Sequence, residues 1–273
     1  MVTGGGSGFG RALGDRCAAL GYAVALLDVD GARAAGEADA LAAERGVRVL
    51  GLRADVADAD DVAAAAAVVD DELGGADLVF SNVGVQQIGA LEGFSDEAWA
   101  WMLDVNVIGA ARVARSFLPL LRRSAHPHLV FTASSSVLVP ASRLAAYQAS
   151  KFAVLGLAET LGLELADDGI AVSVVFPSGM MTRHLESSLA ARPGTVDDPI
   201  APDADMEAMI ASNPGFVRDV ATAEDAARSV VDDVLAGERY IVTHGDLVEP
   251  LHEHQQLIRR AAERARDQSN GER

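Results

Sequence analysis

The sequence contains one cysteine, Cys17, and one lysine, Lys151, among 273 residues. A single cysteine excludes an internal disulfide and a cysteine metal cluster, so we expect a cytoplasmic protein without a metal site. No apolar run approaches the length that a membrane-spanning helix needs, and the glycine-rich start differs from a secretory signal. Proline- or serine-rich linkers are also lacking, which favours a single domain.

Positive charge is scarce as well. The chain carries 22 basic and 40 acidic residues, which gives a net charge of −18. This charge repels nucleic acid and anionic membranes, and no basic patch offsets it, so we expect neither as a partner. The acidic residues are spread along helical stretches, as on a solvated surface.

Short apolar runs alternate with helix-length segments through most of the chain. The runs are rich in valine, leucine and isoleucine, as strands buried on both faces are. The expected strands are 22–29, 47–52, 76–82, 128–134, 170–177 and 239–244, and the expected helices lie near 8–20, 31–45, 58–73, 95–123, 146–168 and 222–236. This alternation predicts an α/β protein with a doubly wound parallel sheet of about seven strands and helices on both faces.

Two segments interrupt the alternation. Residues 179–218 contain glycine, proline, aspartate and methionine without a strand pattern, which is typical of a binding lid or a disordered insert. We expect a substrate lid within a catalytic domain spanning 1–250. Residues 251–273 are polar and predict a C-terminal helix and tail.

The stretch "VTGGGSGFG" stands where a first strand would turn into a first helix. Glycines at Gly4, Gly8 and Gly10 would let the backbone approach a pyrophosphate, and the helix N-terminus would supply N–H groups. A flexible tail is the alternative interpretation of so many glycines. Only Met1, Val2 and Thr3 precede the loop, so either the first strand is very short or the chain begins upstream of this methionine.

Asp28 ends the next expected strand, 18 residues after Gly10. A carboxylate there would hydrogen-bond the adenosine ribose and repel a 2′-phosphate. No basic residue occupies positions 27–30, and the loop offers Ser7 where a basic residue could otherwise meet that phosphate. NAD is therefore favoured over NADP. The alternative is that Asp28 only caps the following helix.

The single lysine lies in "YQASK", four residues after Tyr147. Positions i and i+4 share one face of a helix, so both side chains should point the same way. An ammonium beside a phenol lowers its pKa from about 10 and can still donate to a ribose. A core tyrosine and a surface lysine would be the ordinary alternative.

Three consecutive serines, Ser134, Ser135 and Ser136, follow the expected strand 128–134. They could form only a turn. One hydroxyl at the carboxyl end of a central strand is nevertheless well placed to polarise a carbonyl group.

Together these motifs resemble the short-chain dehydrogenase/reductase family, in its compact single-domain branch with a Rossmann-type sheet. "TGGGSGFG" resembles the family's TGxxxGxG, and "YQASK" is its YxxxK signature. "ADV", "SNVG", "DVNVIG" and "PSGMMT" resemble further family segments, although Ser81, Val83 and Ser178 depart from the usual residues. The matches occur in the family's order over about residues 1–250.

The resemblance implies a catalytic tetrad of Asn106, Ser134, Tyr147 and Lys151. The family's serine stands 13 residues before the tyrosine, which selects Ser134, with Ser135 as the second choice. The implied cofactor contacts come from Gly4, Ser7, Gly8, Phe9, Gly10, Asp28, Asp55, Val56, Asn82, Gly84, Tyr147, Lys151, Pro177, Met180 and Thr182. Tyr147 would be the general acid/base, Ser134 would hold the substrate oxygen, and Asn106 would locate a water behind Lys151.

The expected activity is therefore NAD-dependent interconversion of a secondary alcohol, with an apolar body, and its ketone. The alternatives are an NADP-linked ketone or 3-oxoacyl-thioester reductase, an epimerase or dehydratase that keeps NAD bound, and a non-catalytic dinucleotide-binding sensor. The resemblance also implies a homodimer or homotetramer formed through the helix after YxxxK. That helix is more apolar over 152–165 than one buried face requires.

Overall fold

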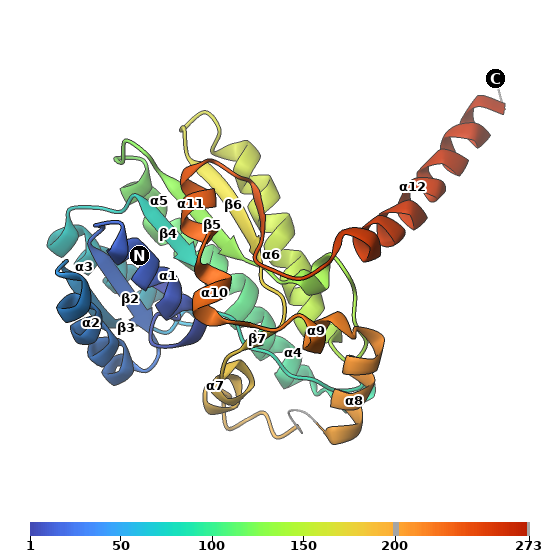
Figure 1. Cartoon of the computed structure of the whole chain (residues 1–273), viewed down its shortest axis with the longest axis horizontal. Helices are drawn as coiled ribbons and strands as arrows, with labels where there is room; N and C mark the ends of the chain where they lie inside the picture. Colours follow the sequence, from blue (N-terminus) through green and yellow to red (C-terminus); the bar gives the residue numbers. More distant parts are fainter. Residues whose placement is uncertain (199–201, 272–273) are drawn as a thin grey trace.

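The protein is described from a computed structural model, which covers residues 1–198 and 202–271. A seven-stranded parallel sheet has the order β3-β2-β1-β4-β5-β6-β9 (Figure 1). Its strands are β1 (Val2–Thr3), β2 (Val24–Asp28), β3 (Val49–Arg53), β4 (Leu78–Ser81), β5 (His128–Thr132), β6 (Ala171–Phe176) and β9 (Tyr240–Val242). The predicted doubly wound sheet is thus confirmed.

Helices cover both faces of the sheet because successive strand side chains point to opposite sides. Leu26, Phe80 and Val130 pack under α1 (Gly8–Ala19), α2 (Gly31–Arg45), α10 (Ala223–Ala227) and α11 (Val230–Leu235). Leu27 and Phe131 belong to the core under α3 (Ala59–Leu73), α5 (Gly109–Leu121) and α6 (Ala145–Glu164). These two apolar cores hold the sheet rigid beneath the site.

Local signals in the sequence fix several helix ends. The side chain of Asp30 accepts a hydrogen bond at the start of α2, and that of Asp58 accepts two at the start of α3. Gly46 and Gly74 end these helices in the left-handed conformation that glycine adopts without strain. The expected helix 95–123 forms α4 (Asp96–Leu103) and α5, joined through the π-helical segment η2 (Asp104–Ile108).

The first strand is only two residues long, yet it occupies the centre of the sheet. Val2 and Thr3 pair with Leu26 and Leu27 of β2, and Val2 pairs with Phe80 of β4. From β1 the chain winds toward β3 on one side and, from β4 on, toward β9 on the other. The direction of winding therefore reverses between β1 and β4, where ligands bind in sheets of this kind.

The described part of the expected lid, 179–198 and 202–218, is folded; residues 199–201 lie outside the described residues. It contains β7 (Met180–Met181), α7 (His184–Ala190), α8 (Asp203–Ser212) and α9 (Gly215–Arg218), and β7 pairs with β8 (Ala221–Thr222). Buried Val196 and Met209 join a third apolar cluster with Trp101 and Tyr147. The segment is thus part of the folded body beside the strand ends.

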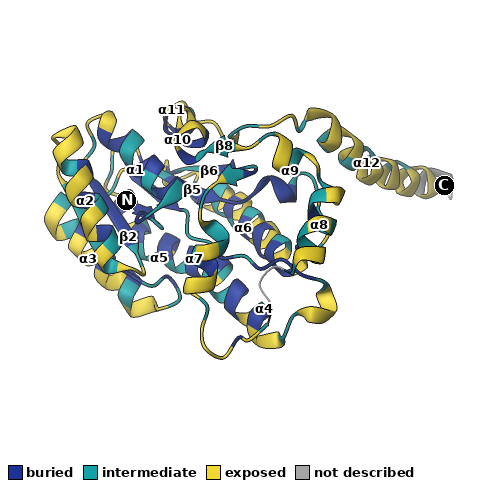
Figure 2. Ribbon diagram, turned by 60° about the horizontal axis from the view of Figure 1, so that its bottom comes forward, coloured by how far each residue is buried: buried dark blue, intermediate teal, exposed yellow. Residues whose placement is uncertain are grey.

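The last helix, α12 (Val248–Gly271), projects away from the body of the protein (Figure 1). Its surface is largely exposed, in contrast to the buried sheet (Figure 2). Two short 3-10 turns, η1 (Leu91–Gly93) and η3 (Ser135–Val137), complete the elements. No helix in the described residues is both long and apolar enough to cross a bilayer.

Candidate active site

The glycine loop connects β1 to α1, and its backbone at Gly10 packs closely against its backbone at Gly4. A Cβ on Gly10 would lie 2.2 Å from the carbonyl oxygen of Gly4, so no side chain fits there. Gly4 and Gly8 have φ angles of 68° and 51°, which glycine adopts readily. The Ser7 side chain makes no capping hydrogen bond, so the first N–H groups of α1 stay free to bind an anion.

Asp28 lies beside this loop at the carboxyl end of β2. Its Oδ2 accepts a hydrogen bond from the backbone N–H of Gly6 at 3.0 Å, and its Oδ1 accepts one from Asp30 at 3.1 Å. The residue that caps α2 is Asp30, not Asp28. Arg33 also lines the cleft here, and its Nε is 3.6 Å from Asp30 Oδ2. Arg33 lies just outside positions 27–30, on which the predicted preference for NAD depends.

The next two strand ends supply the rest of the expected cofactor contacts. Asp55 accepts a hydrogen bond from Ala57 N–H at 2.8 Å, and buried Val56 follows it after β3. The Asn82 side chain donates to Thr3 O at 3.1 Å and accepts from Thr132 Oγ1 at 3.0 Å. Asn82 therefore connects the ends of β1, β4 and β5, next to the point where the direction of chain winding reverses.

Tyr147 and Lys151 lie on one buried face at the start of α6, as the i, i+4 spacing predicts. The Lys151 Nζ is 5.7 Å from the centre of the Tyr147 ring and donates to Thr132 O at 3.0 Å. A Cβ on Gly84 would come within 2.8 Å of that Nζ, so a side chain at position 84 would displace the ammonium from its present place.

Ser134 is the serine whose hydroxyl the fold places near enough to Tyr147 to lower the pKa of its phenol. The Ser134 Oγ also accepts a hydrogen bond from Ser136 N–H at 3.2 Å. Ser135 instead uses its backbone N–H to bind Pro177 O at 2.9 Å. The two neighbouring serines thus have different surroundings, although both are buried.

Burial shifts the pKa values of Tyr147 and Lys151. Burial raises the pKa of Tyr147, and the neighbouring Ser134 hydroxyl offsets only part of that rise. Burial also lowers the pKa of Lys151 from 10.5 to about 8. In the protein alone, burial therefore outweighs the lowering of the phenol pKa that we expected from the neighbouring ammonium.

Asn106 lies in the π-helical segment, a local geometry that is frequent at functional sites. Its Oδ1 accepts from Val85 N–H at 2.7 Å, and its Nδ2 donates to Val85 O at 2.9 Å and to Ser150 Oγ at 2.8 Å. Both amide hydrogens are used, so the side chain fixes the loop after β4 against α6.

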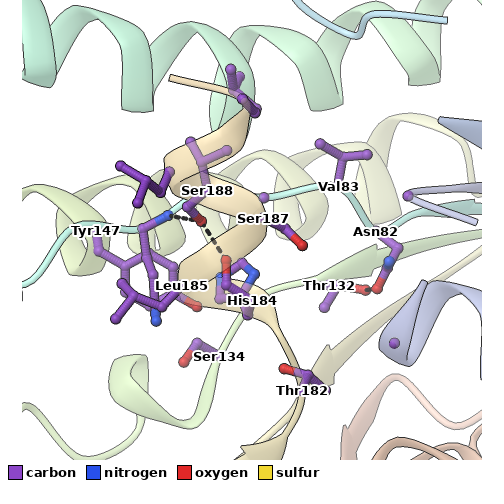
Figure 3. Close-up of a pocket in the computed structure, with 18 of the residues that line it drawn as sticks. Asn82, Val83, Thr132, Ser134, Tyr147, Thr182, His184, Leu185, Ser187 and Ser188 are labelled. Carbon is purple, nitrogen blue, oxygen red and sulfur yellow. Dashed lines mark hydrogen bonds between the residues drawn. The ribbon is translucent and has the colours of Figure 1, made fainter. Parts of the chain in front are cut away.

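The expected nicotinamide contacts follow β6. Pro177 binds the Ser135 N–H, Met180 begins β7, and Thr182 lies close enough to touch a Cβ placed on Gly8, at 3.6 Å. Beyond them, Ser188 Oγ accepts from Gln86 N–H at 3.0 Å and donates to His184 O at 2.8 Å. Helix α7 is thereby joined to the loop that follows β4 (Figure 3).

His184 is a site residue that the sequence did not reveal, because it belongs to none of the motifs that predicted the site. Its ring meets the Tyr147 ring edge to face, with 6.4 Å between the centroids (Figure 3). Burial and the positive charge of Lys151 lower the pKa of His184 to about 4. Within residues 1–198 and 202–271, no group of three His, Cys, Asp or Glu could hold a metal ion.

One cleft of about 1780 Å³ connects these groups. Every predicted site residue except Asn106 lines it, from the glycine loop and Asp28 at one end to Ser134 and Tyr147 at the other. Its volume exceeds that of a pocket for one small ligand. The glycine-lined wall, free helix N-terminus and carboxylate fit a dinucleotide, and space remains for a substrate beside Tyr147.

Comparison with known proteins agrees with this architecture. The family model described as short chain dehydrogenase matches residues 1–193. A 1-deoxy-11-beta-hydroxypentalenate dehydrogenase of Streptomyces exfoliatus is 38% identical over 195 residues, which cover 70% of each chain. A 3-dehydrosphinganine reductase of Arabidopsis thaliana is 31% identical over 247 residues, which cover 89% of this chain and 69% of the other.

The solved structures include a short chain dehydrogenase/reductase from Burkholderia phymatum in complex with NAD. It is 32% identical, has a TM-score of 0.84, and the match covers 94% of this chain and 93% of the other. The chain therefore belongs to the short-chain dehydrogenase family, whose members are oxidoreductases that act on CH–OH groups with NAD or NADP.

Proposed function

We propose that this protein is an NAD-dependent dehydrogenase that interconverts a secondary alcohol and its ketone, with Tyr147 as the general acid/base. The observation that carries the proposal is the meeting of Ser134, Tyr147 and Lys151 at one end of the cleft whose other end is the glycine loop. Residues 1–250 would form the catalytic unit, and 251–273 an appended helix and tail.

The cofactor would be held by the residues of the cleft wall. Its pyrophosphate would lie on the Gly4–Gly10 loop at the start of α1, and its adenosine ribose at Asp28. When bound, NAD⁺ would supply the acceptor for the hydride of the carbinol carbon and a positive charge at that end of the cleft. Pro177, Met180 and Thr182 would contact that end of the cofactor.

Tyr147 would remove the hydroxyl proton during oxidation and return it during reduction. Its Oη must be partly ionised for this task, and burial opposes ionisation. The Lys151 ammonium lies on the same face of α6 and would favour the phenolate, together with the positive charge of a bound nicotinamide. Lys151 would also donate to the nicotinamide ribose, because an ammonium has three hydrogens and one binds Thr132 O.

Ser134 would hold the substrate oxygen beside the Tyr147 hydroxyl. Its Oγ already accepts from Ser136 N–H, which leaves its own hydrogen available to donate. Asn106 would act as a positioning residue, because its amide joins Val85 to the helix that carries Tyr147. The residues at this end of the cleft would thus have separate roles in proton transfer, oxygen binding and positioning.

NAD is the proposed cofactor because the Asp28 carboxylate would lie at the 2′-position of the ribose and repel a phosphate there. A second candidate is an NADP-linked ketone or thioester reductase, which Arg33 favours because it lines the cleft close to Asp30. Steady-state assays of one purified sample with both cofactors test the proposal. A higher kcat/KM with NADPH would reject the NAD assignment.

We further propose a homodimer or homotetramer in the cytoplasm. Phe152 and Leu163 on α6 are 43% and 74% exposed, which is apolar surface that a second copy could cover. Sedimentation at micromolar protein concentration tests this proposal, and a stable monomer would contradict it.

A further inference from the structure

His184 is a titratable residue of the cleft that has no role in the proposed mechanism. It is the first residue of α7, its ring contacts Tyr147, and it lines the cleft. Among the described residues, its ring nitrogens have no hydrogen-bond partner, and its ring packs edge to face against the Tyr147 ring. A polar ring beside the proposed general acid/base is therefore available to a ligand.

The position of His184 is fixed by its own backbone. Its carbonyl accepts a hydrogen bond from buried Ser188, whose Oγ also accepts from Gln86 N–H. The first turn of α7 is thereby held against the loop after β4. An imidazole with a fixed backbone and free nitrogens can select among ligands, since an unmade hydrogen bond in a cleft costs binding free energy.

The imidazole is uncharged at neutral pH, because its pKa is lowered to about 4. A neutral imidazole has one donor and one acceptor, so it suits a hydroxyl or a carbonyl oxygen. It lacks the positive charge that would compensate a carboxylate for its lost hydration.

Other cations in the described cleft wall do not supply that charge at this end. Arg33 lies beside Asp30 at the adenosine end, and Lys151 is bound to Thr132 O. Arg183 points largely to solvent, with its side chain 66% exposed, and pairs with Glu186 at 3.1 Å. The nearby wall is apolar and includes Val85, Ile88, Trp101, Leu144 and Met209.

We propose that His184 is a specificity-determining residue that hydrogen-bonds a second, uncharged oxygen of the substrate. The substrate class is then a neutral secondary alcohol or ketone with an apolar body and a further hydroxyl or carbonyl group near the reacting carbon. Carboxylates are disfavoured in the same place. This inference rests on the proposed function, because it takes Tyr147 as the reacting site.

Two matched pairs of alcohols test the inference with NAD⁺ and the full-length protein. The first pair is 1-phenylpropane-1,2-diol and 1-phenylpropan-2-ol, which differ by the second hydroxyl. The second is methyl 3-hydroxy-3-phenylpropanoate and the free acid, which differ by charge. NADH formation gives kcat/KM for each. We expect the diol and the ester to exceed their partners by about tenfold or more.

The variant His184→Phe keeps an aromatic ring but removes both nitrogens. We expect it to lower the diol-to-monoalcohol ratio of kcat/KM by about tenfold. His184→Gln retains a donor and an acceptor and should recover part of that ratio. The control is His126→Phe, an exposed residue just before β5, at the amino ends of the strands and away from the cleft; it should keep the wild-type ratio.

The outcomes separate the inference from the function. NADH formation with equal preference for both members of each pair, or an unchanged ratio in His184→Phe, overturns the role of His184 and leaves the dehydrogenase standing. A preference for the free acid overturns the neutral substrate class. NADH formation from none of the four alcohols, by protein that still binds NAD⁺, overturns the proposed function and the inference with it.

Discussion

Lys151 donates its ammonium hydrogen to the backbone carbonyl of Thr132 at 3.0 Å, so α6 is joined to the end of β5 beneath the cleft. The lysine side chain is buried there beside Gly84, in a space that would not admit even a Cβ on that glycine. One buried cation therefore connects the helix that carries Tyr147 to the strand that leads to Ser134.

We expect Lys151→Arg to lose at least about a hundredfold in kcat/KM, although it conserves the charge. The guanidinium is larger than an ammonium, and the Lys151 side chain is already buried, 3% exposed, beside Gly84. Steady-state kinetics checks the loss, and thermal unfolding shows whether the variant is folded. Activity within tenfold of wild type would contradict the proposed role of the ammonium.

Lys151→Met should be inactive but more stable than wild type at pH 7. The pKa of Lys151 is lowered from 10.5 to about 8, so holding the charged form buried costs about 3 kcal/mol at most. Methionine has a similar length and no charge, but it leaves Thr132 O without its partner, which offsets part of the gain.

The pH dependence of that stability difference has a definite sign. Below pH 8, Lys151 is protonated in both the folded and the unfolded state, so the full cost of burying its charge lowers the free energy of unfolding. Between about 8 and 10.5 the unfolded chain binds a proton that the folded chain does not, so the free energy of unfolding rises with pH. Urea titrations of wild type and Lys151→Met should therefore converge as the pH approaches 10.5. A constant difference would show that the lysine is not held charged at a cost.

Tyr147→Phe should reduce kcat by about a thousandfold or more, because the other hydroxyls of α6, Ser150 and Thr160, do not line the cleft. The ring stays in the third apolar cluster, so the fold and the affinity for NADH should change little. Fluorescence titration with NADH measures the binding separately from turnover. Tyr240→Phe is the matched control, since Tyr240 lies on the edge strand β9 and is 50% exposed. Turnover by Tyr147→Phe near the wild-type rate would remove the proposed general base.

The variants Ser134→Ala and Ser135→Ala should differ clearly in kcat/KM. The first removes the hydroxyl that meets Tyr147 and should cost about a hundredfold or more in kcat/KM. The second keeps the backbone N–H that binds Pro177 O and should cost less than about tenfold. Kinetics of both variants with the same alcohol decides between them, and the reverse order would assign the oxygen-binding role to Ser135.

Asp28→Ala should shift the cofactor preference toward NADP. Removal of the carboxylate ends its repulsion of a 2′-phosphate and leaves Arg33 nearby to attract one. We expect the ratio of kcat/KM with NAD⁺ to that with NADP⁺ to fall by about a hundredfold, in assays at low salt. Because Gly6 N–H also loses its partner, a melting curve should accompany the kinetics. An unchanged ratio would mean that Asp28 does not contact the ribose.

Much of the fold could be predicted because its signals are local. Continuous apolar runs marked the strands to within about two residues, and Asp58 and Gly74 mark both ends of α3. The i, i+4 spacing placed Tyr147 and Lys151 on one face. By contrast, the two short helices α10 and α11 replace one expected helix at 222–236, and the lid contains helices that its sequence did not indicate.

The sequence by itself determined the alternation of strands and helices, the glycine loop and the relation of Tyr147 to Lys151, since each depends on residues close together in the chain. Tertiary structure alone decided that Ser134 meets Tyr147, that Asn106 joins Val85 to Ser150, and that His184 lies beside both catalytic candidates. It also decided the ionisation of the site, because burial depends on contacts between distant segments. That is why the pKa of Tyr147 is raised where proximity to an ammonium alone predicts a fall.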